Sequence, residues 1–302
     1  MRNMSQKIVM GGSGSQGLAA RVAHKMGSVF GNVEIKTFPD GEKYLRIHTP
    51  VEGKEVVLIQ TMGFMPDRLL MEMLFLTETL KELGASKITG VIPYFAYSRQ
   101  DTSFKRGEVV SFRVVSKLLE FSGIDELYTV DLHLHRVTDA ESLFNIPCHN
   151  LTAMSVIGEF IKENYSLLDP KVLAPDEEAE QWAKAMSEKL GVDYAVMRKV
   201  RKGPTEVEIS TDELDVNGRD VVIVDDIIST GGTMATAISI AKRAGARNVL
   251  VACTHPLLIG GALSLIHQAG ALEVIGTDTV PSTVRVVSID KLLADHLSRG
   301  DP

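Results

Sequence analysis

"VVIVDDIISTGGTMATAISIAKRAGA", residues 221–246, passes from an apolar run through two aspartates into a loop of small residues and then into a helical pattern. The run Val221–Val224 is apolar at every position, which is typical of a strand buried on both faces of a parallel sheet. Met234–Ala244 has the spacing of an amphipathic helix, and Gly245 follows it as a terminator. Strand, loop and helix in this order predict one unit of an α/β fold.

The same alternation continues along the chain. Further strands are predicted at Val56–Gln60, Lys87–Ile92, Leu127–Val130, Lys171–Leu173 and Val249–Cys253. Further helices are predicted at Arg68–Leu83, Val109–Phe121 and Glu178–Leu190. The expected fold class is therefore α/β, with mainly parallel sheets flanked by helices.

The two halves of the chain resemble each other. "KIVMGGSGSQGLAARVAHKMG" begins at Lys7 and "KVLAPDEEAEQWAKAMSEKLG" begins at Lys171, and both have the pattern of strand, turn and helix ending in glycine. The matching order predicts two tandem domains of one architecture, residues 1–148 and 149–302. The alternative is that independent βα units simply look alike. Two similar domains usually place a ligand at an interface, within or between subunits.

Composition limits the class of partner. The formal net charge of -7 gives no global attraction to nucleic acid or acidic membranes, so an anionic ligand needs local positive groups. Two cysteines, Cys148 and Cys253, offer no disulfide framework and fit a reducing cytosol. No run approaches the ~18 apolar residues that a membrane helix needs. We expect a soluble, cytoplasmic protein that binds neither nucleic acid nor membrane.

The loop between the strand and the helix of the opening stretch is a candidate phosphate site. It lies where open α/β sheets bind ligands, and the amino end of the helix offers unpaired N–H groups to an anion. It lacks the lysine of a Walker A motif, so a single phosphate is the expected guest. The loop residues are Ser229, Thr230, Gly231, Gly232 and Thr233.

Asp225 and Asp226 precede this loop by too many residues to touch the same phosphate. A sugar phosphate explains both features, because the carboxylates can accept hydrogen bonds from ribose hydroxyls or meet them through a metal ion. The alternative is a capped strand end followed by a turn.

Residues 225–233 resemble the phosphoribosyl-binding signature that phosphoribosyltransferases share with ribose-phosphate pyrophosphokinases. The signature alone does not choose between the two families. Three stretches of the first half resemble pyrophosphokinase motifs: "TFPDGEKYLRI" (37–47), "PYFAYSRQDTSFKRGE" (93–108) and "VDLHLH" (130–135). The resemblance to that family extends along nearly the whole chain.

The resemblance implies an ATP side in the first half. The aromatic residue of the first motif would stack on adenine, and its two acidic residues would contact the nucleotide in a neighbouring subunit. Taken alone, the same residues form a Pro-Asp-Gly turn. The residues assigned to ATP by resemblance are Phe38, Asp40, Glu42, Arg99, Gln100, Asp101 and His133.

The stretch "VDLHLH" leaves an alternative open. Period-two alternation in a strand would put Asp131, His133 and His135 on one face, where they could bind a transition metal. No third and fourth ligand follows at a convincing spacing. The resemblance instead places His133 at Mg-ATP, and the role of His135 stays open.

The second half contributes two further matches. By resemblance, Asp176 in "APDEEAEQWA" lies near the metal and the ribose, although alone it is a plausible helix cap. Lys199 and Arg201 in "RKVRKGPTEVEI" match a Lys-x-Arg pair on a loop that closes over the transferring phosphates. Taken alone, this cluster is a solvated charge run.

The function implied by the resemblance is that of an enzyme, a ribose-phosphate diphosphokinase that uses Mg²⁺, with His133 and Asp176 near the metal. Such an enzyme makes phosphoribosyl diphosphate and AMP from ATP and ribose 5-phosphate for nucleotide biosynthesis. We expect a homo-oligomer, at least a dimer, with a tetramer or hexamer favoured. The rival classes are a phosphoribosyltransferase and a catalytically silent regulatory homologue.

A glycine pattern near the start of the chain points elsewhere. Gly12, Gly14 and Gly17 form GxGxxG between a strand and a helix, as in dinucleotide-binding folds. In those folds an acidic residue ends the second strand, whereas Glu34 begins one. We therefore do not expect NAD binding.

Overall fold

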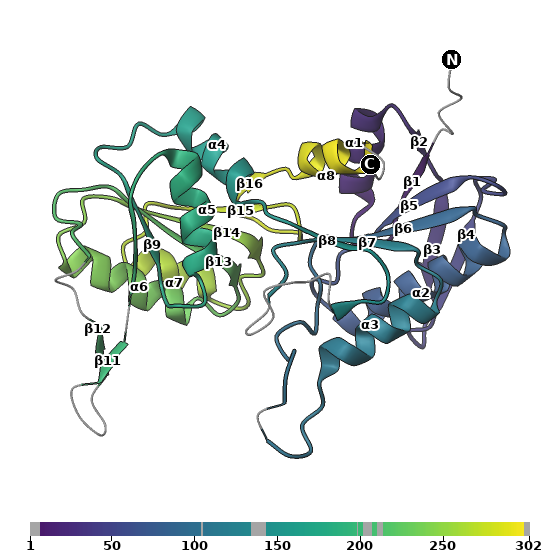
Figure 1. Ribbon diagram of the computed structural model, residues 1–302, viewed down its shortest axis with the longest axis horizontal. Coiled ribbons are helices and arrows are strands. Elements are labelled where there is room, and N and C mark those ends of the chain that lie inside the picture. The colour runs from purple at the N-terminus through teal and green to yellow at the C-terminus, as the bar shows by residue number, and fades with distance from the viewer. Residues whose placement is uncertain are drawn as a thin grey trace. The chain divides into compact units, whose positions relative to one another are not determined.

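The computed structural model describes residues 7–103, 105–133, 143–197, 199–201, 207–209 and 214–298. These residues form two compact units (Figure 1). The first unit contains the described residues up to Leu151 together with the segment from Ser288, and the second unit is Thr152–Val287.

The first unit is built on a six-stranded parallel sheet with strand order β2-β1-β5-β6-β7-β8. The strands are β1 Ile8–Gly11, β2 Val29–Phe30, β5 Glu55–Ile59, β6 Lys87–Ile92, β7 Glu126–Val130 and β8 Cys148–Leu151. Its helices are α1 Gln16–Met26, α2 Pro66–Glu82, α3 Ser111–Phe121 and α8 Asp290–Ser298. A separate antiparallel hairpin consists of β3 Val33–Thr37 and β4 Lys43–Ile47.

The second unit has a six-stranded parallel sheet with strand order β10-β9-β13-β14-β15-β16. The strands are β9 Lys171–Ala174, β10 Tyr194–Val196, β13 Val221–Ile228, β14 Val249–Pro256, β15 Glu273–Thr277 and β16 Arg285–Val287. Its helices are α4 Met154–Asn164, α5 Glu180–Leu190, α6 Gly232–Arg243 and α7 Ala262–Gln268. Its antiparallel hairpin consists of β11 Lys199–Arg201 and β12 Val207–Ile209.

The two strand orders are the same when each unit is numbered from its own first strand. Each unit also inserts a hairpin at the same point of the chain path, between its second and third sheet strands. The prediction of an α/β fold with two similar parallel-sheet domains is therefore confirmed.

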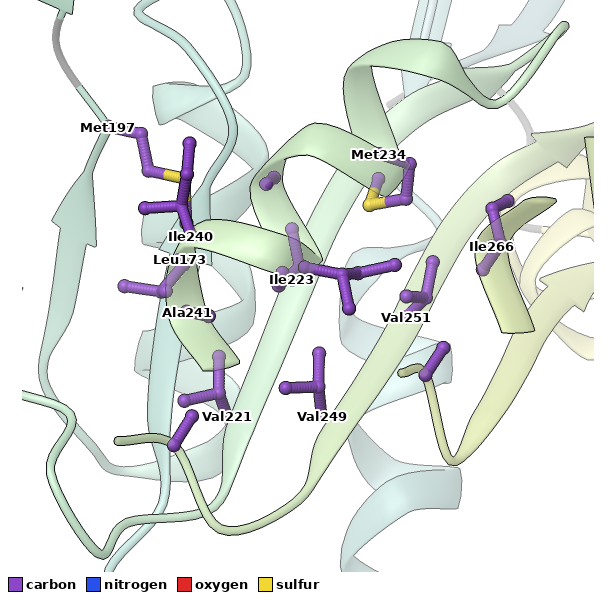
Figure 2. Close-up of a cluster of buried hydrophobic side chains, with 14 of the residues drawn as sticks. Leu173, Met197, Val221, Ile223, Met234, Ile240, Ala241, Val249, Val251 and Ile266 are labelled. Atoms are coloured by element: carbon purple, nitrogen blue, oxygen red, sulfur yellow. The ribbon is translucent and has the colours of Figure 1, made fainter. Parts of the chain in front are cut away.

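Apolar runs form the strands because both faces of each central strand are covered. All eight residues of β14 are buried, and side chains of β9, β13 and β14 pack against α6 and α7 in one core (Figure 2). The labelled residues of this core include Leu173, Ile223, Val251, Ile240 and Ile266. Removing these side chains from water is the main term that favours the fold.

Strand β13 is longer than the sequence predicts. The apolar run ends at Val224, but pairing with β14 continues through Asp225 and on to Ile227 and Ile228. Both aspartates, predicted to precede the loop, therefore lie on the strand itself. Tertiary pairing, which a local apolar pattern does not report, extends the strand.

Helix α8 comes last among the described elements, yet it packs on α1 of the first unit (Figure 1). Leu293 and Leu297 of α8 are buried, and the carboxylate of Asp290 lies 3.6 Å from Arg21 and 3.7 Å from Lys25 on α1. The predicted boundary, which assigns residues 149–302 to one domain, differs from this division because these contacts draw α8 to the first unit. In the second unit, α4 packs on α5 in the corresponding way.

No helix in the described part of the chain is both long and apolar enough to cross a membrane.

Replacing Leu293 with alanine should destabilise the first unit. Its side chain is fully buried, and deleting a buried leucine typically costs about 2–5 kcal/mol. We expect a lower midpoint of denaturant unfolding and faster amide hydrogen exchange in α1. Leu272→Ala, at a residue that is 59% exposed, is the control. Unchanged exchange in α1 would contradict the assignment of α8 to the first unit.

Candidate functional site

The predicted phosphate loop joins β13 to α6 and has a fixed backbone. Gly231 has φ 79°, in the left-handed region that favours glycine, and a Cβ there would lie 3.1 Å from the carbonyl oxygen of Ala262. The N–H of Ile259 donates to the carbonyl oxygen of Ser229 at 2.9 Å. The loop is therefore held against the segment that follows β14, in a shape that strongly favours glycine at position 231.

This loop presents polar groups at the amino end of α6. Thr230, Gly232 and Thr233 are exposed, and Ser229 is half-buried. Within the described residues, the hydroxyls of Ser229, Thr230 and Thr233 make no hydrogen bond. Together with the N–H groups of the first helical turn, they form a set of donors suited to an oxyanion.

Three carboxylates influence one another beside this loop. Burial raises the pKa of Asp225 well above its usual value, and the charges of Asp226 and Asp176 raise it further. Asp226 is buried, and its Oδ1 accepts a hydrogen bond from the N–H of Ile227 at 2.7 Å. The Oδ1 atom of Asp176 accepts from Glu178 and Ala179, each at 3.1 Å, which fixes the turn before α5. Such crowded acidic groups favour a bound cation or a shared proton.

The donor chemistry of these carboxylates fits a hard divalent cation. Among the described residues, no group of three or more His, Cys, Asp or Glu side chains forms a ready-made metal site. Magnesium is commonly held by one or two carboxylates together with substrate phosphates, rather than by an all-protein cage. The neighbouring carboxylates Asp176 and Asp225 therefore fit a cation that completes its coordination with phosphate oxygens.

Lys199 and Arg201 lie on β11, whose backbone pairs with β12 at Lys199↔Ile209 and Arg201↔Val207. The chain leaves the core for this hairpin at Met197, which is 1% exposed and whose N–H donates to Ala174 (Figure 2). The two predicted catalytic residues are thus on a short hairpin anchored in the core of the second unit.

In the first unit, the turn Phe38–Glu42 connects β3 to β4. The N–H of Phe38 donates to the carbonyl oxygen of Glu42 at 2.8 Å, and Asp40 Oδ1 accepts from the N–H of Glu42 at 3.1 Å. Phe38 is 50% exposed and contacts the ring of Tyr44 edge-on, with centroids 6.3 Å apart. The turn geometry expected for Pro-Asp-Gly is confirmed, and it leaves the Phe38 ring about half exposed.

The segments with Arg99 and His133 follow β6 and β7, which are neighbours in the sheet. Their carboxyl ends therefore lie at one edge of the first unit's sheet. Arg99 is exposed, whereas Gln100, Asp101 and His133 are half-buried. A buried aromatic group of Phe95, Phe112 and Phe144 supports the residues just before Arg99.

The alternation predicted for Asp131, His133 and His135 is wrong for the first two residues. Strand β7 ends at Val130, and Asp131 has φ 41°, so the backbone turns and period-two alternation stops. The N–H of Asp131 donates to the carbonyl oxygen of Leu151 at 2.7 Å, which fixes this turn. His135 lies outside the described residues.

The glycine-rich turn after β1 is occupied by the protein itself. Glu72 Oε2 accepts hydrogen bonds from the N–H of Ser13 at 3.2 Å and from its hydroxyl at 2.5 Å. Gln60 Oε1 accepts from the N–H of Gly14 at 3.0 Å. The donors of Ser13 and Gly14 in this turn are thus taken by Glu72 and Gln60. Glu72 was not singled out from the sequence, although an acidic residue between Leu69 and Met73, on the apolar face of a helix, was a usable signal.

Comparison with known families agrees with this geometry. Residues 7–123 match the N-terminal domain of ribose phosphate pyrophosphokinase, and residues 142–269 match the phosphoribosyl transferase domain.

Individual relatives match over nearly the whole chain. A ribose-phosphate pyrophosphokinase of Methanothermobacter thermautotrophicus is 44% identical, over 95% of this chain and 99% of that protein. One from Methanobrevibacter smithii is 40% identical, over 96% of this chain and 99% of that protein. The crystal structure of phosphoribosylpyrophosphate synthetase from Mycobacterium smegmatis has a TM-score of 0.87 at 30% identity, with 97% of each chain covered. The chain belongs to the ribose-phosphate pyrophosphokinase family.

Proposed function

We propose that this protein is an ATP:D-ribose-5-phosphate diphosphotransferase. It transfers the β,γ-diphosphoryl group of ATP to the anomeric hydroxyl of ribose 5-phosphate, giving phosphoribosyl diphosphate and AMP. The observation that carries this proposal is the donor-lined loop Ser229–Thr233 directly after a strand that bears two carboxylates. That arrangement suits a sugar with a terminal phosphate better than it suits either group alone.

Ribose 5-phosphate binds in the second unit. The loop N–H groups and the hydroxyls of Ser229, Thr230 and Thr233 hold the 5-phosphate, and Gly231 and Gly232 allow its close approach. Asp225 and Asp226 accept hydrogen bonds from ribose hydroxyls or meet them through a cation. These contacts orient the anomeric hydroxyl for attack on the β-phosphorus of ATP.

ATP is bound by residues of the first-unit motifs. Phe38 stacks on adenine through its exposed face, and an Arg99 fork suits phosphate oxygens. The nucleotide-binding set is Phe38, Asp40, Glu42, Arg99, Gln100, Asp101 and His133.

Phosphoryl transfer needs positioning and neutralisation of charge more than covalent chemistry. Lys199 and Arg201 supply positive charge to the phosphate oxygens as the bond to AMP breaks. By resemblance to the family, His133 and Asp176 are the residues that would hold Mg²⁺ with the substrate phosphates. When bound, the metal screens repulsion among the phosphate oxygens.

The protein acts in nucleotide biosynthesis, and we place it in the cytoplasm as a homo-oligomer. Arg99–Asp101 and His133 already give the first unit an ATP side, so the Phe38–Glu42 turn serves the ATP site of a neighbouring subunit. The residues of this turn are exposed, which supports this arrangement.

An acceptor-free assay tests the reaction. The protein with ATP, magnesium and ribose 5-phosphate should release AMP, and omitting any one of the three should abolish the release. A phosphoribosyltransferase would form no AMP without a base as acceptor, and a silent homologue would form none at all. Release of ADP instead of AMP would reject transfer of a diphosphoryl group.

Gly231→Ala should weaken ribose 5-phosphate binding selectively. The new Cβ combines an unfavourable φ with a contact of 3.1 Å to the carbonyl oxygen of Ala262, so the loop must change shape. We expect the KM for ribose 5-phosphate to rise about tenfold or more, equivalent to ~1.4 kcal/mol, with the KM for ATP nearly unchanged.

Gly218→Ala is the matched control, because Gly218 has φ 76° but no atom within 4 Å of an added Cβ. It should reproduce the backbone strain without the effect on KM. A rise in the KM for ATP alone would show that the two substrate sites are assigned the wrong way round.

Mixing Phe38→Ala and Lys199→Ala, each inactive alone, should restore partial activity. If the turn serves a neighbour's site, each site needs an intact Lys199 hairpin from one subunit and an intact Phe38 turn from the other. Random subunit exchange in a two-fold dimer gives that combination in about a quarter of the sites. A mixture of Lys199→Ala and Arg201→Ala should show no recovery, because no hairpin is then intact. Native mass spectrometry confirms the exchange, and an active monomer would reject the shared site.

A further inference from the structure

The ATP turn has little sheet to support it. Strands β3 and β4 pair only with each other, in a two-stranded sheet separate from the main sheet of the first unit. An isolated two-stranded hairpin is marginally stable in water. A groove of about 580 Å³, lined in part by Glu42 and Arg68, lies beside the turn. The turn is therefore not packed closely on α2 at this point, and its position depends on contacts elsewhere.

One such contact follows the turn directly. Lys43, the residue after Glu42, is nearly buried, and its Nζ lies 2.5 Å from Oε1 of the fully buried Glu72 on α2. The other carboxylate oxygen of Glu72 accepts hydrogen bonds from Ser13 and from Gln60 Nε2, the latter at 3.0 Å. Burial opposes ionisation of Glu72, but the bonds from Lys43 and Ser13 outweigh it and lower its pKa. A charged Glu72 thus anchors Lys43.

A second contact precedes the turn directly. The Nη2 atom of Arg68 donates to the hydroxyl of Thr37, the residue before Phe38, at 2.5 Å. Arg68 and Glu72 are four residues apart on α2, so they lie on adjacent turns of the same helix face. The helix therefore contacts the hairpin on both sides of the turn.

We propose that Arg68 and Glu72 are positioning residues that hold the ATP-binding turn through Thr37 and Lys43. This proposal rests on the proposed function of Phe38, Asp40 and Glu42 in binding ATP. The four contacting residues, Thr37, Lys43, Arg68 and Glu72, form what we term the turn clamp. None of the four needs to touch ATP for this role.

The exposed half of the clamp can be tested without disturbing the core. Arg68→Ala and Thr37→Val each remove one hydrogen bond and should raise the KM for ATP about threefold to tenfold, the range expected for one net hydrogen bond. The turnover number kcat and the KM for ribose 5-phosphate should stay within about twofold. The double variant should be no worse than either single variant, because both remove the same contact.

Lys36→Ala is the matched control. Lys36 is on the same hairpin, next to Thr37, but its ion pair with Glu34 stays within the hairpin. This variant should leave the KM for ATP unchanged. An equal rise in the Lys36→Ala control would show that the hairpin is generally sensitive and would overturn the proposal.

The buried half of the clamp needs a readout besides activity. Glu72→Gln keeps the shape of the side chain but removes the charge that holds Lys43. Amide hydrogen exchange at Phe38, Gly41 and Glu42 should become faster in Glu72→Gln and Arg68→Ala, and not in Lys36→Ala. Hydrogen exchange is measured without substrate, so it tests the turn clamp independently of activity. Failure of the wild-type protein to release AMP would reject the proposed function but would leave this test of the clamp intact.

Two results would overturn the proposal. One is unchanged exchange at the turn in both Arg68→Ala and Glu72→Gln. The other is a loss of kcat and of both substrate affinities to the same extent, in proportion to the loss of folding stability of each variant. A contact that only stabilises the fold would give that result.

Discussion

The pairing of β13 with β14 is the interaction on which the proposed sugar site depends. It continues past the apolar run to Ile228, so Asp225 and Asp226 are held as part of a rigid strand. Successive side chains of a strand point to opposite faces, so the two aspartate side chains leave the strand on opposite sides of the sheet, with Asp225 half-buried and Asp226 fully buried. The loop then starts at a fixed place, and Gly231 turns the chain into α6. Rigidity of the strand thus sets the position of both the carboxylates and the phosphate donors.

The two units share one architecture but carry different functional residues. Each unit inserts its hairpin after the second strand of its sheet. In the first unit this hairpin presents an aromatic residue and two acidic residues, and in the second it bears Lys199 and Arg201. The same topological insertion therefore serves base recognition in one unit and charge neutralisation in the other, under the function proposed above.

Local pattern was enough to predict the central strands β5, β6, β13 and β14, because burial of both sheet faces produces apolar runs that are visible in sequence. Lys87–Ile92 was predicted with the bounds that the structure has. What local pattern missed depends on distant partners. The extension of β13 needs β14, the ionised Glu72 needs Lys43 and Ser13, and the place of α8 needs α1. The loop Ser229–Thr233 was predicted from its place between a strand and a helix. The ATP, metal and hairpin residues came from resemblance, since Phe38 in a turn or Asp176 at a helix start has an ordinary structural role as well.

The position of α8 has a consequence for synthesis of the chain. A ribosome makes α1 early and α8 only after every residue of the second unit, so the side of α1 on which α8 packs waits for its cover. The first unit is thus the first to be translated but cannot be the first to be completed. During that interval the first unit is an incompletely folded domain, the kind of species in which exposed apolar surface promotes aggregation.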